Sequence, residues 1–309
     1  MTIMATPAAR RAAAERRIDL SSIRPTGKTG YIQLSDVYAA KRYTPLAKAV
    51  ADYYKVDILG LTPNGRSIVK KDVLAFLDSN AASGKIPLTA MRRVIAQRME
   101  SSARNVPQFT LFGEFDMQMV KTHFAGLKNE LWQTENLKMT FSDVLIKLSA
   151  EALKSHPLVN ASFKGDHILL NGDINIGLAV ALDSGLIVPN IKHVDRMTLA
   201  EVAKARIAMV TKARAGKLKP DDYSGGTFTI SNLGGYPVSQ FNPLINEPES
   251  GIMGVGRMAD MPVVIDGNIG IRPILGLSVT FDHRTVDGAE GGKFLATIKT
   301  LIDDPSWLV

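Results

Sequence analysis

One stretch near the C-terminus organises the chain: Ser278-Val-Thr-Phe-Asp-His-Arg-Thr-Val-Asp-Gly288. It joins an apolar, β-branched run at 274–281, which predicts a buried strand, to a glycine-rich segment with the apolar spacing of a helix. His283 is therefore expected at the end of a strand. A neutral imidazole in such a place accepts a proton near neutral pH. We predict that His283 transfers a proton, against the alternative of a satisfied structural histidine.

Length and composition place the chain in a broad class. Its 309 residues suffice for two or more domains, and 45% hydrophobic residues support a substantial core. We find neither an apolar run long enough for a membrane span nor the apolar core of a secretory signal. There is no cysteine, which excludes disulfides, thiolate metal sites and cysteine nucleophiles. A soluble cytoplasmic protein without a metal site is expected.

The net charge of +7 is unevenly distributed. Residues 1–85 carry 14 Lys and Arg against 7 Asp and Glu, whereas residues 86–309 carry 23 against 23. Such a basic segment attracts either nucleic acid or an acidic protein surface. The segment has no zinc-ligand spacing, no RNA-binding motif and few interleaved aromatic residues. We therefore expect an acidic protein partner and no nucleic acid.

The basic segment contains an internal repeat. Each copy begins with Thr-Pro, at Thr6-Pro7 and Thr44-Pro45, and predicts a short helix, a tight turn and a second short helix. The turns include Gly27 and Gly30 in copy one, and residues 63–66 in copy two, whose loop is two residues shorter. The pattern resembles the peripheral subunit-binding domain of 2-oxoacid dehydrogenase acyltransferases, which implies docking of partner subunits. The alternative is a helical appendage that packs on the main domain.

We divide the chain accordingly. Residues 1–42 and 43–79 form two subunit-binding-like units, residues 80–85 form a short polar linker, and residues 86–309 form the main domain. The main domain mixes predicted helices and strands in an order that indicates one large sheet. The expected helices lie at 89–99, 141–154 and 199–216, and the expected strands at 106–116, 168–170, 174–182, 186–192 and 225–232. His156 is expected to be structural, and Arg284 to be an ion-pair partner of a neighbouring aspartate.

The order of motifs across the main domain resembles the catalytic domain of a 2-oxoacid dehydrogenase acyltransferase. The motifs are an Arg-Met helix, Val-Pro-Gln-Phe, Asn-Ile-Gly, Gly-Leu-Ile-Val-Pro, Gly-Gly-Thr-Phe-Thr-Ile-Ser, Asn-Pro-Leu-Ile-Asn-Glu-Pro-Glu and Asp-His-Arg-Thr-Val-Asp-Gly. The last contains the His-x-x-x-Asp-Gly signature of this and the chloramphenicol acetyltransferase families. The resemblance implies an α/β, chloramphenicol acetyltransferase-like two-layer sandwich with a large mixed sheet.

The resemblance also implies roles for individual residues. His283 would be the general base, Ser231 would donate a hydrogen bond to the oxyanion, and Asp287 would stabilise the local loop or orient the site. Trimers of the family build each site from two subunits, so a homotrimer or a higher, cage-like homo-oligomer is expected. Acetyl-CoA would be the co-substrate, with Arg92 and Arg93 as candidate phosphate contacts.

The resemblance leaves the acceptor open. The chain starts at the repeat, without the lipoyl domain that precedes it in regular members, so no covalently bound lipoyl group is expected. We therefore favour acetyl transfer to a small-molecule hydroxyl, as in relatives that acetylate tetronate intermediates in antibiotic biosynthesis. The first alternative is a dihydrolipoamide acyltransferase core that uses lipoyl groups from another chain. The second is a scaffold without catalytic activity.

Overall fold

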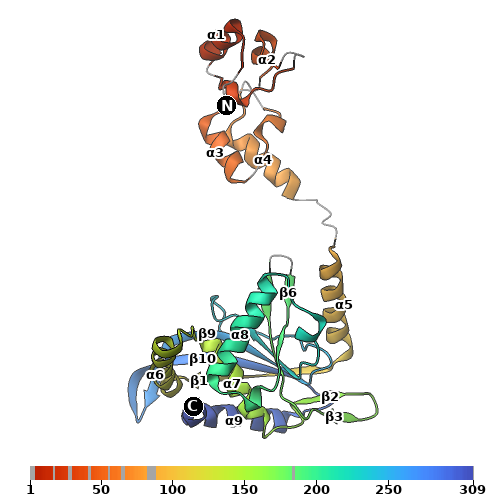
Figure 1. Cartoon of the computed structure of the whole chain (residues 1–309), viewed down its shortest axis with the longest axis vertical. Helices are drawn as coiled ribbons and strands as arrows, with labels where there is room; N and C mark the ends of the chain where they lie inside the picture. Colours follow the sequence, from red (N-terminus) through yellow and green to blue (C-terminus); the bar gives the residue numbers. More distant parts are fainter. Residues whose placement is uncertain are drawn as a thin grey trace. The chain divides into compact units, whose positions relative to one another are not determined.

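The computed structural model describes residues 4–16, 18–26, 30–40, 43–54, 56–63, 67–81, 88–182 and 185–308. It divides the chain into two compact units, Met1–Pro87 and Leu88–Val309, which are shown in Figure 1.

The first copy of the repeat folds around small apolar side chains. Helix α1 (Pro7–Arg16), the 3₁₀ turn η1 (Leu20–Ser22) and helix α2 (Leu34–Ala39) surround a core of alanine, isoleucine and valine. Asp36 closes the start of α2, because its carboxylate accepts the backbone N–H of Gln33 at 2.8 Å. Gly27 of the predicted turn lies outside the described residues.

The second copy has the same elements. Helix α3 (Pro45–Tyr53), the 3₁₀ turn η2 (Ile58–Gly60) and helix α4 (Lys70–Ala81) surround their own core. Helix α4 continues two residues into the predicted linker, and residues 82–87 are not among those described, nor are 64–66 of the predicted turn. The domain limits drawn from the sequence remain a prediction.

The Leu88–Val309 unit is built on a six-stranded mixed sheet. The strand order is β1-β10-β9-β8-β4-β7, in which β8 runs parallel to β9 and to β4 and the other neighbours are antiparallel. The strands are β1 (Gln108–Asp116), β4 (Ile176–Leu178), β7 (Asn190–Ile191), β8 (Phe228–Asn232), β9 (Gly251–Ile265) and β10 (Asn268–Asp282). The expected large mixed sheet is confirmed.

Helices cover one face of this sheet, as Figure 1 shows. Their apolar stripes meet alternate residues of the strands, such as Phe228 and Ile230 on β8 and Val279 and Phe281 on β10, in one continuous core. The helices of this unit are α5 (Ala90–Asn105), α6 (Gln118–Glu135), α7 (Phe141–Leu153), α8 (Leu199–Arg214) and α9 (Gly288–Asp303). The intervening positions of the strands point to the opposite face, which carries hydroxyl side chains.

Short elements complete the unit. Two separate hairpins pair β2 (Ala161–Phe163) with β3 (Ile168–Leu170), and β5 (Val180–Leu182) with β6 (Gly185–Ile187). The 3₁₀ turns are η3 (Val194–Arg196), η4 (Pro220–Asp222) and η5 (Pro305–Leu308). Among the helices of the described residues, none has the length and apolarity needed to cross a membrane.

The structure differs from the sequence prediction in several elements. The single strand expected at 174–182 is divided into β4 and β5, because the chain leaves the large sheet after Leu178 and pairs with β6 instead. Helix α6 and strand β9 were not predicted. The strand expected at 274–281 is the second half of β10, which extends back to Asn268 as one arm of a long hairpin with β9.

Candidate active site

His283 lies in the turn that directly follows β10. Its backbone N–H donates to the carbonyl of Pro107 at 2.8 Å, which holds the turn against the start of β1. The imidazole ring packs against Phe109 with 4.7 Å between ring centroids, and the residue is otherwise exposed. The backbone and one ring face are therefore fixed, while neither ring nitrogen has a hydrogen bond to another of the described residues.

Arg284 stabilises this turn. Its guanidinium binds both carboxylate oxygens of Asp282, with a shortest distance of 2.7 Å, and donates to the carbonyl of Asn105 at 3.0 Å. It also lies over the ring of Phe163, 4.3 Å from the centroid. The hydrogen bond to Asp282 raises the pKa of Arg284 above its ordinary value. The ion-pair interpretation of Arg284 thus holds for Asp282.

Asp287 begins helix α9. Its carboxylate accepts the backbone N–H of Glu290 at 2.8 Å, as the N-cap residue of that helix. The carboxylate thereby fixes where the turn ends and the helix starts. This contact agrees with a role in shaping the loop that carries His283.

His156 lies at the end of α7 and contacts α9. One ring nitrogen is 2.9 Å from a carboxylate oxygen of Glu290, and the other is 2.8 Å from the hydroxyl of Thr297. Both nitrogens are therefore engaged within the fold, and the residue is buried. It joins two helices and leaves no nitrogen for a substrate.

Ser231 lies on the polar face of the sheet, far along it from His283. Ser231 of β8 is opposite Gly254 of β9, and Gly254 is opposite Ser278 of β10. His283 follows Ser278 by five residues, past the end of the strand. At roughly 3.3 Å per residue and 4.8 Å between strands, the two backbones are more than about 15 Å apart. One chain alone does not bring the serine and the histidine together.

A buried carboxylate near Ser231 was not predicted from the sequence. Glu249 is enclosed beside β8, where it accepts from the hydroxyl of Thr229 at 2.6 Å and from the amide of Asn246 at 2.8 Å. Burial without a directly bound cation raises the pKa of Glu249 to about 7. Thr229 and Ser231 are two residues apart and share a face of the strand. The Asn-Glu-Pro-Glu motif is the only local sign of this carboxylate in the sequence, but charged residues beside a proline are equally typical of a surface loop.

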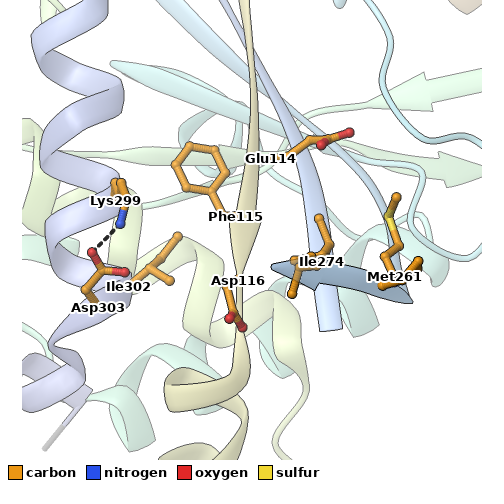
Figure 2. Close-up of a pocket in the computed structure, with 10 residues that line it drawn as sticks. Glu114, Phe115, Asp116, Met261, Ile274, Lys299, Ile302 and Asp303 are labelled. Carbon is orange, nitrogen blue, oxygen red and sulfur yellow. Dashed lines mark hydrogen bonds and ion pairs between the residues drawn. The ribbon is translucent and has the colours of Figure 1, made fainter. Parts of the chain in front are cut away.

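Three cavities lined by described residues of this unit are of interest here. One, with a volume of about 350 Å³, lies between the end of β1, the turn-proximal half of the β9–β10 hairpin and α9 (Figure 2). Its β1 residues, 114–116, are at the end of that strand remote from His283. Two more cavities of about 330 and 430 Å³ run beside α5 and share Arg98, Met99 and Asn246. The second of these borders the loop that leads to Glu249.

Arg92 and Arg93 lie on the first turn of α5. The helix starts where the sequence predicted, because the hydroxyl of Thr89 accepts the backbone N–H of Arg92 at 3.1 Å. Both arginines are exposed. The cavity of about 330 Å³ is lined by Met91, Ile95 and Arg98 of the same helix. A contact of these arginines with CoA remains a prediction.

Comparison with protein families assigns most of the chain. Residues 80–309 match the 2-oxoacid dehydrogenases acyltransferase (catalytic domain), and residues 3–38 match the e3 binding domain. The chain belongs to the 2-oxoacid dehydrogenase acyltransferase family and is an acyltransferase. The fold class, the family and the enzyme class predicted from the sequence are confirmed.

Individual relatives align with nearly the whole chain. The succinyltransferase component of the Rickettsia typhi 2-oxoglutarate dehydrogenase complex is 34% identical over 98% of this chain and 71% of its own length. The acetyltransferase component of the Staphylococcus aureus pyruvate dehydrogenase complex is 36% identical over 100% of this chain and 71% of its own length. Both relatives act on a dihydrolipoyllysine residue, and they differ in the acyl group.

Solved structures agree in the fold. A probable dihydrolipoamide acetyltransferase from Listeria monocytogenes superposes with a TM-score of 0.70 at 33% identity, covering 72% of this chain and 96% of that one. The cubic core of a pyruvate dehydrogenase complex gives 0.69 at 32% identity, covering 72% and 92%.

A third solved structure concerns three candidate catalytic residues. The dihydrolipoamide acetyltransferase of Azotobacter vinelandii, with a TM-score of 0.69, 32% identity and the same coverage of 72% and 92%, was studied for the roles of a serine, a histidine and an asparagine. That serine and histidine are 52 residues apart, and the asparagine follows the histidine by four. Ser231, His283 and Asp287 have the same spacing, with aspartate in place of asparagine.

Proposed function

We propose that the chain is the acyltransferase core of a 2-oxoacid dehydrogenase complex, which transfers an acyl group between CoA and a dihydrolipoyl thiol. The relatives described above, which resemble this chain over nearly its full length, act on dihydrolipoyllysine. None of them acts on a small-molecule hydroxyl, so the preference for a tetronate-type acceptor and for antibiotic biosynthesis is unsupported. The alternative with a dihydrolipoyl acceptor takes its place.

The catalytic roles follow from the chemistry of the side chains. The neutral imidazole of His283 takes the proton of the acceptor thiol, and the sulfur attacks the thioester carbonyl carbon. The carbonyl oxygen becomes an oxyanion, to which the hydroxyl of Ser231 donates a hydrogen bond. The carbon–sulfur bond to CoA then breaks, and the leaving thiolate takes the proton from the imidazolium.

The site is completed between two copies of the chain. The observation that carries this proposal is the register of the sheet, which separates Ser231 from His283 by more than about 15 Å within one chain. A serine and a histidine with the spacing of a catalytic pair in a relative must then meet across an interface. A homotrimer, alone or in a larger cage, provides such an interface by cyclic symmetry. Arg92 and Arg93 are our candidates for binding the CoA phosphates.

The first copy of the repeat docks a partner enzyme. Residues 3–38 match the e3 binding domain, which supports binding of an E3 partner enzyme. Residues 1–42 carry 8 Lys and Arg against 3 Asp and Glu, so an acidic patch on the partner suits this unit.

A subunit-mixing experiment tests the shared site. His283→Ala and Ser231→Ala chains are each purified, dissociated, mixed in equal amounts and reassembled. If the two residues come from different subunits, random mixing restores about a quarter of the wild-type activity. Activity that stays at the level of the separate variants, in mixtures shown by mass spectrometry to be hybrid, contradicts a shared site.

The acceptor is tested separately. The protein is incubated with acetyl-CoA or succinyl-CoA and either dihydrolipoamide or its dihydroxy analogue, and CoA release is followed. We expect transfer to the dithiol, since a thiol is far more acidic than an alcohol and gives its proton readily to imidazole. Transfer to the diol alone would overturn the proposed acceptor, and absence of CoA release with every pair would overturn the enzymatic function.

A further inference from the structure

Glu249 is a buried acid whose hydrogen-bond donors are all neutral. The residue is 3% exposed, and its carboxylate oxygens accept from the hydroxyl of Thr229 at 2.6 Å and from the side-chain amide of Asn246 at 2.8 Å. It forms no ion pair with a lysine, arginine or histidine of the described residues. A buried carboxylate without a paired cation is costly, so the protonated, neutral acid is the favoured form in this place.

The charged groups around Glu249 do not compensate for its burial. Strands β7, β8 and the buried first half of β9 carry no charged side chain. Arg98, an exposed residue of α5, attracts the carboxylate from a distance, but burial outweighs this attraction and raises the pKa of Glu249 to about 7. Glu247 of the same loop hydrogen-bonds to α5, and Asp282, at the end of β10, is paired with Arg284.

A second buried polar group also favours the protonated acid. Asn190 of β7 is 2% exposed, and its side-chain oxygen has no hydrogen-bond partner among the described residues. This oxygen and the hydroxyl of Thr229 are neighbours, because a Cβ atom on Gly177 would lie 2.9 Å from the first and 3.0 Å from the second. An ionised Glu249 takes the only hydrogen of the Thr229 hydroxyl. A protonated Glu249 donates to that hydroxyl instead and frees its hydrogen for the amide oxygen.

Glu249 lies beside the strand that carries Ser231. Thr229, to which Glu249 is hydrogen-bonded, precedes Ser231 by two residues on the same face of β8, so their backbones are about 7 Å apart. The proposed reaction develops negative charge on an oxyanion at Ser231. An ionised carboxylate at Thr229 would repel that charge through the poorly screening protein interior, whereas the neutral acid would not.

We propose that Glu249 is a positioning residue of the active site, which in its protonated form holds Thr229 in place and keeps the face around Ser231 free of negative charge. This inference rests on the proposed function, which places the oxyanion at Ser231. Acyl transfer then has two proton requirements, since His283 must be neutral and Glu249 must be protonated. The second requirement is lost as pH rises through about 7, where Glu249 ionises and the reaction slows.

The substitution Glu249→Gln removes the charge and nearly keeps the shape of the side chain. The matched control is Glu247→Gln, the same exchange two residues earlier in the loop. Single-turnover rates of acyl transfer from acetyl-CoA or succinyl-CoA to dihydrolipoamide are measured for the full-length proteins from about pH 5.5 to about pH 8.5. Each variant is compared with wild type at the same pH, so that the titrations of His283 and of the substrate thiol cancel. Thermal melts show that the variants are folded.

We expect the rate of Glu249→Gln relative to wild type to rise about tenfold over this pH range, because only the wild type acquires the buried charge. The relative rate of Glu247→Gln should not depend on pH. A purely structural role for Glu249 would change the rate by the same factor at every pH. A relative rate of Glu249→Gln that is constant with pH, whether near one or uniformly low, therefore overturns the inference.

The protonation of Glu249 is measured independently of any variant by infrared spectroscopy of the wild-type protein. Exposed carboxylates are ionised at pH 6, so the C=O stretch of a protonated carboxylic acid at that pH reports a buried acid. Carbon-13 labelling of glutamate should shift this band, and it should disappear as pH rises through about 7. Absence of the band at pH 6 overturns the inference. Failure of the wild type to transfer an acyl group to dihydrolipoamide at any pH would instead overturn the proposed function, with the band still present.

Discussion

The two faces of the six-stranded sheet differ in chemistry although the same strands build them. On β8, Phe228 and Ile230 point into the core beneath the helices, while Thr229 and Ser231 point to the other side. On β10, Val279 and Phe281 alternate with Ser278 and Thr280 in the same way. This alternation separates packing from catalysis, so changes on the two faces should have separable effects.

The largest effect is expected beyond the end of β10. His283→Ala should lower the rate of acyl transfer by about 10²- to 10⁴-fold, because it removes the general base. The side chain is exposed, so the melting temperature should stay within a few degrees of wild type. Steady-state kinetics beside a thermal melt separates the two quantities. A variant with full activity would remove His283 from the mechanism.

A substitution on the helix-covered face should lower the stability and leave the rate of acyl transfer unchanged. Phe228→Ala leaves a cavity in the core where Phe228 contacts Phe294 with 6.0 Å between ring centroids, and should destabilise the unit by about 3 to 5 kcal/mol. Urea unfolding measures the loss, and the rate per folded molecule at low temperature should remain near wild type. If the activity falls while stability does not, the two faces are not functionally separate.

Replacing Glu249 measures how much stability is lost by burying an acid on the polar face. Because its pKa is raised from 4.5 to about 7, the folded state binds more protons than the unfolded state, and its contribution to stability is lost as pH rises through this range. Glu249→Gln removes this loss, which is on the order of 3 kcal/mol. The difference in urea midpoint between variant and wild type should therefore grow in the variant's favour from pH 5 to pH 8. A difference that does not depend on pH would mean that Glu249 stays charged in the folded state.

The smallest effect is expected at the helix cap that supports the histidine turn. Asp287→Ala removes the hydrogen bond to the N–H of Glu290 and should cost about 1 kcal/mol of stability. Asp287→Asn restores the cap and the residue type of the Azotobacter relative, so it should recover the stability. The chemical denaturation curves of both variants provide the comparison. If the asparagine variant loses as much stability as the alanine variant, the negative charge of Asp287, and not its hydrogen bond to the N–H of Glu290, stabilises the unit.

Some elements could be predicted because their signals are local. Thr89 caps α5 as expected, and the α9 segment starts after Asp287 as its glycine-rich sequence indicated. Helix α6 also has a local pattern in the sequence, because its buried Val120 and Phe124 are followed by apolar residues at helical spacing. Strand β9 lacks a clear alternation, because its first half is buried on both faces.

The sequence by itself determined the family, the position of His283 at a strand end, the pairing of Arg284 with a neighbouring aspartate, and the repeat. These depend on residue types and on short spacings along the chain. Only the tertiary structure decided that Ser231 and His283 lie far apart in one chain, because strand register joins segments distant in sequence. It also decided the burial of Glu249 and the exposure of Tyr53, since solvent access depends on what the rest of the fold packs against each side chain.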